Sequence, residues 1–301
     1  MINQVYPDSR GFLWIATESG LNKYDGSKFI TYKHNRTDST TLLDNYVRCI
    51  FEDSRGTLYV GGLKGIQRYN YEAESFTDIP IMTPDGHSVG RHIVSINELD
   101  DHSLLMCTSG YGILFLYPGQ DSIFIENDKY NLPPIINASL QTSDKSIWLA
   151  TGSDGVMRIT PQGKVVNYPL KAGHKSTSTT CLCMDAEENI YAGTNGDGLF
   201  VLDKSREHFS SVADPSVADK PIMALYMNTP TELYIGTDGY GLRIYDTQKM
   251  EFKPIPLVSS VIDLKHSKIH SIAKDNYGNI WLGIYQKGVL LLPHIKTNFT
   301  Y

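Results

Sequence analysis

The feature that most constrains this chain is a repeat that occurs seven times, at intervals of 43 to 47 residues. Each copy contains a short run of aromatic, aliphatic and small residues, which first appears as WIAT at 14–17. Aligned on the first residue of that run, the seven copies begin at Trp14, Tyr59, Leu105, Trp148, Tyr191, Tyr234 and Trp281. A fixed period in the forties is the signature of a β-propeller, in which each repeat forms one blade. We therefore predict an all-β fold, a seven-bladed β-propeller of four-stranded antiparallel blades.

Two positions inside the repeat have a clear physical reason. The second residue after the anchor is small in every copy, which indicates crowding where strands of neighbouring blades converge. These residues are Ala16, Gly61, Cys107, Ala150, Gly193, Gly236 and Gly283. A glycine followed by an apolar residue then marks a hairpin between the second and third strands, because glycine readily takes the positive φ of a tight reversal. It stands at Gly20, Gly65, Gly112, Gly155, Gly198, Gly241 and Gly288.

We predict one domain over residues 1–301. Its blades span approximately 2–32, 47–79, 93–125, 136–168, 179–212, 222–255 and 269–301. The chain starts with a first strand and ends with a fourth, so we expect the ring to close by packing blade seven against blade one. Most of the variation lies in the segments between blades, which are surface loops where a binding function can be placed.

Composition excludes several functions. The 27 basic and 33 acidic residues give a net charge of −6, which argues against nucleic acid or an anionic membrane as a partner. The chain contains no run of 18 apolar residues and residues 1–30 do not read as an export signal, so we expect no direct membrane insertion by this segment. The four cysteines fall far apart or two residues apart on one strand, which is poor geometry for disulfides. We interpret Cys49, Cys107, Cys181 and Cys183 as small buried hydrophobic residues.

No recognised catalytic or metal-binding motif is present. The sequence lacks G-x-S-x-G, H-E-x-x-H, C-x-x-C and a phosphate-binding glycine loop. The histidines are scattered through loops, where solvation is their usual state. The acidic turns GSDG at 152–155 and NGDG at 195–198 lack the ligand spacing of a calcium loop and serve equally well as turns. We therefore predict no catalytic residue, no cofactor and no metal.

The candidate ligand-binding residues lie at the hairpins between second and third strands. In blades three to seven this hairpin is one residue longer than in blades one and two. Tyrosines and carboxylates at the longer hairpins suit a polyhydroxylated ligand, because rings stack on apolar sugar faces and carboxylates accept hydroxyl protons. Tyrosine and aspartate also simply favour turns, and that explanation stays open. The predicted set is Arg91, Tyr111, Asp154, Asp197, Tyr240 and Tyr285.

The innermost strands offer a second place for a ligand. Some residues that follow the first apolar position of these strands would line the central channel. Among them Arg48 and His270 could hold an anionic group, and a solvated channel wall is the alternative.

The run DSRGFLWIATESGLNKYD at 8–25, and DNYGNIWLG at 275–283 with Gly288 and Val289, resemble the two-component regulator propeller repeat. Blades one, two and seven resemble it best, whereas blades three, four and six depart from it at the turn before the anchor. The resemblance implies the extracytoplasmic, periplasmic sensor region of hybrid two-component histidine kinases of Bacteroidetes, which sense carbohydrate breakdown products. In that family two propellers typically precede a β-sandwich, a membrane helix, and kinase and receiver domains. None of these later parts is in the sequence.

Three hypotheses follow. The first is a sensor propeller that is not itself an enzyme and recognises an oligosaccharide or similar ligand. Its other partners would be a second copy in a homodimer and the further domains of the parent sensor kinase. The second is a dimerisation or spacing platform whose ligand site lies elsewhere. The third is a propeller lyase or hydrolase acting on a glycan.

Overall fold

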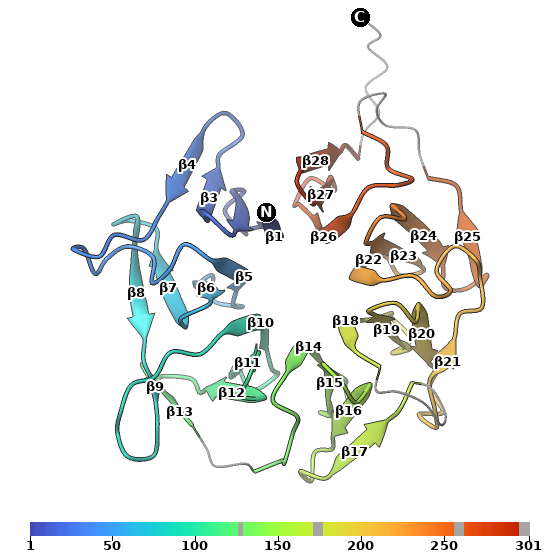
Figure 1. The fold of residues 1–301 in the computed structure, drawn as a ribbon, viewed down its shortest axis with the longest axis horizontal. Helices are drawn as coiled ribbons and strands as arrows, with labels where there is room; N and C mark the ends of the chain where they lie inside the picture. Colours follow the sequence, from blue (N-terminus) through green and yellow to red (C-terminus); the bar gives the residue numbers. More distant parts are fainter. Residues whose placement is uncertain (126–128, 171–176, 256–261, 295–301) are drawn as a thin grey trace, which may run out of the picture.

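The computed structural model describes residues 1–125, 129–170, 177–255 and 262–294. Seven antiparallel sheets surround a central axis, with strands β1, β5, β10, β14, β18, β22 and β26 innermost (Figure 1). Every regular element in the described ranges is a strand. The predicted seven-bladed propeller of four-stranded antiparallel blades is confirmed.

Within each described sheet of the blades, consecutive strands follow one another from the axis outward, and five of these sheets have four strands. Blade one contains β1 (Ile2–Pro7), β2 (Leu13–Thr17), β3 (Gly20–Tyr24) and β4 (Phe29–Tyr32). Blade two contains β5 (Val47–Glu52), β6 (Leu58–Gly62), β7 (Ile66–Asn70) and β8 (Ser75–Ile79), and is followed by β9 (Ile81–Met82). Blade three contains β10 (Ile93–Glu98), β11 (Leu104–Thr108), β12 (Ile113–Leu116) and, on its outer side, β13 (Ile123–Phe124).

The other four blades follow the same order. Blade four contains β14 (Ile136–Gln141), β15 (Ile147–Thr151), β16 (Val156–Ile159) and β17 (Val165–Tyr168). Blade five contains β18 (Thr179–Met184), β19 (Ile190–Thr194), β20 (Leu199–Leu202) and β21 (Ser210–Ser211). Blade six contains β22 (Ile222–Thr229), β23 (Glu232–Thr237), β24 (Leu242–Asp246) and β25 (Glu251–Lys253). Blade seven contains β26 (Ile269–Lys274), β27 (Ile280–Ile284) and β28 (Gly288–Leu292), and its predicted fourth strand at 298–301 lies outside the described residues.

Blade three differs from the others at its outer edge. Strand β13 pairs in parallel with β9 and not with β12, so the hydrogen-bonded sheet contains only β10, β11 and β12. Pro80 separates β8 from β9 and cannot donate a backbone hydrogen bond, while its carbonyl accepts one from the amide of Ile123 at 2.8 Å. The outer edge of β12 therefore has no hydrogen-bonded neighbour strand in the described part of the chain.

The small residue after each anchor sits where two blades meet, as predicted. A Cβ on Gly193 would come within 2.7 Å of both Cys181 Sγ and Ile222 Cγ2, the latter from the first strand of the next blade. On Gly236 it would lie 2.5 Å from the carbonyl oxygen of Ile269. Contacts this short leave no space for a larger side chain, which explains the pattern.

Blade seven packs directly against blade one. The backbone amide of Val5 on β1 donates to Ser271 Oγ on β26 at 2.9 Å. Val5 also belongs to a buried cluster that Ile2 and Trp281 complete from the two blades. This packing closes the ring between blades seven and one, as the sequence predicted.

The four cysteines are free thiols in the structure. Cys49 and Cys107 are buried as predicted, but Cys181 and Cys183 on β18 are only partly buried. Burial raises the pKa of Cys49 and Cys181 to about 12 and that of Cys107 and Cys183 to about 11. Thiols with such pKa values are unreactive near neutral pH.

Candidate functional site

One rim of the propeller is built from the hairpins between second and third strands and from the loops that enter the first strands. Backbone hydrogen bonds join the two kinds of loop between neighbouring blades. The turn glycine of one blade donates to a carbonyl just before the first strand of the next blade: Gly112 to Pro134 at 2.8 Å and Gly155 to Thr177 at 3.1 Å. Gly198 and Gly241 repeat this bond with Lys220 and Ser267. The bonds hold the rim of blades three to seven in a fixed arrangement.

A buried threonine fixes the backbone of the longer hairpins in blades three to six. In blade five, Thr194 Oγ1 accepts a hydrogen bond from the amide of Asp197 at 2.9 Å and donates to the carbonyl of Gly198 at 2.7 Å. Thr108, Thr151 and Thr237 make the same pair of bonds. These bonds use only the main chain of the residue before the glycine, so its side chain is free to vary between blades. That is the position of Tyr111, Asp154, Asp197 and Tyr240.

The predicted tyrosines each face a cation. The Arg91 guanidinium lies 5.0 Å from the ring centre of Tyr111, so these two predicted residues are together. The Lys220 ammonium lies 4.4 Å from the ring of Tyr240 and that of Lys268 lies 5.4 Å from the ring of Tyr285. Sequence reasoning missed both lysines. The sequence did contain a signal for them, because each lysine lies one or two positions before the first strand of the blade that carries its tyrosine.

The two predicted aspartates lie on blades four and five. Asp154 accepts a hydrogen bond from Ser153 Oγ at 2.6 Å. With Tyr240 and Tyr285 on blades six and seven, these side chains are distributed around the rim. Whether they act as one ligand-binding set stays a prediction.

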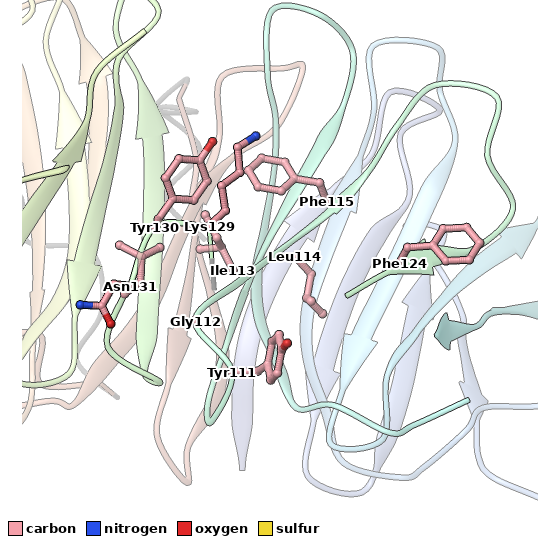
Figure 2. Close-up of a pocket in the computed structure, with 10 residues that line it drawn as sticks. Tyr111, Gly112, Ile113, Leu114, Phe115, Phe124, Lys129, Tyr130 and Asn131 are labelled. Atoms are coloured by element: carbon pink, nitrogen blue, oxygen red, sulfur yellow. The ribbon is translucent and has the colours of Figure 1, made fainter. Parts of the chain in front are cut away.

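A pocket with a cavity volume of about 50 Å³ lies beside Tyr111, on the outer part of blade three (Figure 2). Its lining comes from the hairpin and β12, from β13, and from the loop that leads to blade four. Of the predicted set, only Tyr111 lines it. The remaining lining residues are Gly112, Ile113, Leu114, Phe115, Phe124, Lys129, Tyr130, Asn131 and Leu132.

The pocket combines exposed rings with polar groups. Phe124 keeps 58% of its surface exposed, an unusual state for a phenylalanine on a strand. Lys129 and Asn131 are exposed at the same pocket, and the Lys129 ammonium lies 5.3 Å from the ring centre of Tyr130. The pocket follows the outer edge of β12, where the sheets of blades one, two, four, five and six place a bonded fourth strand. Because it depends on the pairing of β13 with β9, the sequence repeat did not reveal it.

A second polar region lies at the inner strands. The register of every first strand shifts at its second residue, so this residue forms a β-bulge next to the channel. In blades one and four the bulged residue bonds to the next blade: Asn3 Nδ2 donates to the Val47 carbonyl and Asn137 Nδ2 to the Thr179 carbonyl, both at 2.7 Å. Arg48 and His270 occupy the bulge in blades two and seven.

No group of three or more histidine, cysteine or acidic side chains is close enough to hold a metal ion within 1–125, 129–170, 177–255 and 262–294. In the same ranges no helix has the length and apolarity needed to cross a membrane.

Comparison with known proteins identifies the repeat. The family described as "Two component regulator propeller" matches residues 41–64 and 263–286. These segments contain the first two strands of blades two and seven, together with the loops before them. No curated protein matches the chain significantly.

Solved structures share the fold. One is the extracellular domain assigned to the hybrid two component system BT3049 from B. thetaiotaomicron, with a TM-score of 0.82 and 24% identity over 96% of this chain. Another is that of BT4673 from the same organism, with a TM-score of 0.77 and 19% identity over 96% of this chain. This chain spans 39% of the length of each. The WD40 propeller domain of Doa1 matches 98% of the chain at 12% identity, with a TM-score of 0.68, so the architecture alone is widely shared. The chain is thus a seven-bladed propeller in which blades two and seven match the two component regulator propeller repeat.

Proposed function

We propose that this propeller is the extracytoplasmic ligand-recognition module of a two-component sensor, and that it binds an oligosaccharide or similar polyhydroxylated ligand. Two observations support the assignment to a sensor. The matched repeats belong to a regulator propeller family, and the fold is that of extracellular domains of two-component systems. In this proposal the parent protein is a periplasm-facing histidine kinase.

The observation that carries the ligand proposal is the pocket on blade three. Tyr111 packs against the buried cluster on one face of β12, and Phe115 and Tyr130 pack against the cluster on the other face, so a ligand would meet rings from two sides. Phe124 on β13 adds a fourth ring to the lining. Sugar rings have apolar faces that stack on aromatic side chains. Lys129 and Asn131 can hydrogen-bond to hydroxyl groups around such a ring.

Signalling requires that the ligand favours one arrangement of the sensor over another. The pocket joins β12 to β13, which is itself paired with β9 after blade two. A ligand that spans β12 and β13 would therefore couple blades two and three. We infer that occupancy changes how these blades contact the rest of the sensor or a second copy in a homodimer.

A glycan array with this chain would find the ligand, and calorimetry would then measure its affinity for variants. We expect Tyr111→Ala combined with Phe124→Ala to weaken binding at least tenfold, about 1.4 kcal/mol. Tyr277→Ala is a matched control, because Tyr277 is 78% exposed on a turn at the other rim. Unchanged affinity in the double variant would place the site elsewhere. Turnover of the bound glycan would favour a lyase or hydrolase, and the absence of any bound glycan would favour a platform role.

A further inference from the structure

The mouth of the central channel gathers basic side chains from blades two, three and seven. Arg48 and His270 stand at the bulges of β5 and β26, both of which pack against β1. His92 immediately precedes β10, and its ring packs against that of Tyr46 with centroids 5.7 Å apart. Lys268 immediately precedes β26. This concentration of positive groups occurs in a chain whose net charge is −6.

These basic side chains outnumber the carboxylates that form ion pairs with them. Asp238 is bonded to Lys268 at 2.9 Å and to His270 Nε2 at 3.3 Å. Arg48 has no carboxylate at ion-pair distance among the residues that the structure describes. With Asp238 offsetting Lys268, Arg48 remains a cation without a paired carboxylate in the described part of the chain even when both imidazoles are neutral.

His92 adds a polar atom without a partner. Its Nε2 is buried, and no hydrogen bond reaches it from any described residue. A buried polar group without a partner costs free energy that a bound ligand can recover. His92 stands at the start of β10, which packs against β5, the strand that carries Arg48.

The electrostatics of the two histidines support a common site. Burial lowers the pKa of His92, and the positive charge of Arg48 lowers it further. Burial also lowers the pKa of His270; Asp238 opposes this effect, whereas Lys268 and Arg48 add to it. Arg48 and His270 stand at equivalent bulges of the two first strands that flank β1. The uncharged rings Tyr46 and Tyr285 are the other groups that pack against them.

We propose that Arg48, His92 and His270 bind an anion, namely a carboxylate, sulfate or phosphate group of a ligand, at the mouth of the central channel. The side chain of His270 is 17% exposed and that of Lys268 is 48% exposed, so the mouth is open to an incoming group. The guanidinium of Arg48 would supply the bidentate contact that such oxyanions prefer. This site is separate from the pocket on blade three and does not depend on the proposed sensor function.

The test measures binding of small probes by calorimetry and by NMR of the histidine rings. Sulfate, phosphate and galacturonate represent the three anion types, and galactose is the neutral control for galacturonate. We expect at least one anion to bind and galactose not to bind at this site. Arg48→Gln should weaken anion binding at least tenfold, while Lys220→Gln, which removes a rim cation beside Tyr240, should leave it unchanged.

Sulfate serves for the pH series because its own charge is constant. An anion favours the protonated imidazoles, so sulfate should bind more tightly at pH 5.5 than at pH 8 and should raise the pKa of both rings.

Thermal unfolding of Arg48→Gln and of Arg48→Lys verifies that the variants are folded. Absence of binding by all three anions, or full binding by folded Arg48→Gln, would overturn the proposal.

Discussion

The indole Nε1 of Trp14 donates a 2.7 Å hydrogen bond to Oδ2 of Asp8, across the turn between β1 and β2. The same relationship, six residues apart, joins Asp53 to the hydroxyl of Tyr59 and Asp275 to the indole of Trp281. In blade four a threonine takes the place of the aspartate, and Thr142 Oγ1 accepts from Trp148. The turn aspartate and the aromatic anchor of these repeats are therefore joined by a hydrogen bond.

Asp8→Ala should destabilise the propeller strongly. Asp8 is buried and also accepts bonds from the amides of Arg10 and Phe12 and from the hydroxyl of Tyr71. Removing the carboxylate leaves several donors unsatisfied, so we expect a loss of about 2 kcal/mol or more in the free energy of unfolding. Urea denaturation followed by circular dichroism measures it. Asp121→Ala, which removes an exposed ion pair with Arg68, should cost less than about 1 kcal/mol; equal losses would contradict this reading.

Gly236→Ala should be more destabilising than Gly283→Ala, although the two glycines are equivalent in neighbouring blades. A Cβ at Gly236 would meet the Ile269 carbonyl oxygen at 2.5 Å, and backbone cannot move aside easily. At Gly283 the nearest atoms belong to the side chains of Ile2 and Ser271 at 3.1 Å. We expect a difference of about 1 kcal/mol or more. Unfolding both variants under the same conditions checks it, and the reverse order would show that blade spacing adjusts freely.

The four thiols should react slowly in the native protein. Burial raises the pKa of each thiol to about 11 or 12, so the reactive thiolate is scarce at neutral pH. A thiol reagent such as DTNB should modify four cysteines after denaturation without reductant, and few before it. Fewer than four after denaturation would reveal a disulfide. Rapid reaction of the folded protein would instead show that β18, which carries Cys181 and Cys183, opens readily.

Asp275 should contribute to acid sensitivity. Burial alone would raise the pKa of Asp275, but bonds from Asn279 and Trp281 and from backbone amides outweigh burial and lower it. A carboxyl whose folded pKa is depressed stabilises the fold above its unfolded pKa of about 3.9, and this contribution is lost as pH falls through the folded value. Below about pH 4, Asp275→Asn should therefore lose less stability per pH unit than the wild type. Parallel curves in urea unfolding from pH 5 to 2.5 would contradict this.

The repeat made most of the architecture predictable, because anchor, small residue and turn glycine report strand spacing directly. The repeat could not reveal that β13 of blade three pairs with β9 and not with β12. Ile123 is fully buried as a fourth-strand residue should be, yet its strand pairs with β9, and the period of the repeat does not encode that pairing. Of the candidate site, Tyr111 and Arg91 were found because hairpin and loop share a rim. Phe124 and Tyr130 were missed because their positions around the pocket depend on the pairing of β13 with β9.

The bond from Val5 to Ser271 has a consequence for how the repeats share stability. A linear array of repeats has two terminal units that each lack a neighbour, so such arrays need special capping repeats and fray from their ends. Here blade one meets blade seven, and each unit has a neighbour on both sides. Loosening any one blade must disrupt two interfaces at once, so local opening has no preferred end from which to begin.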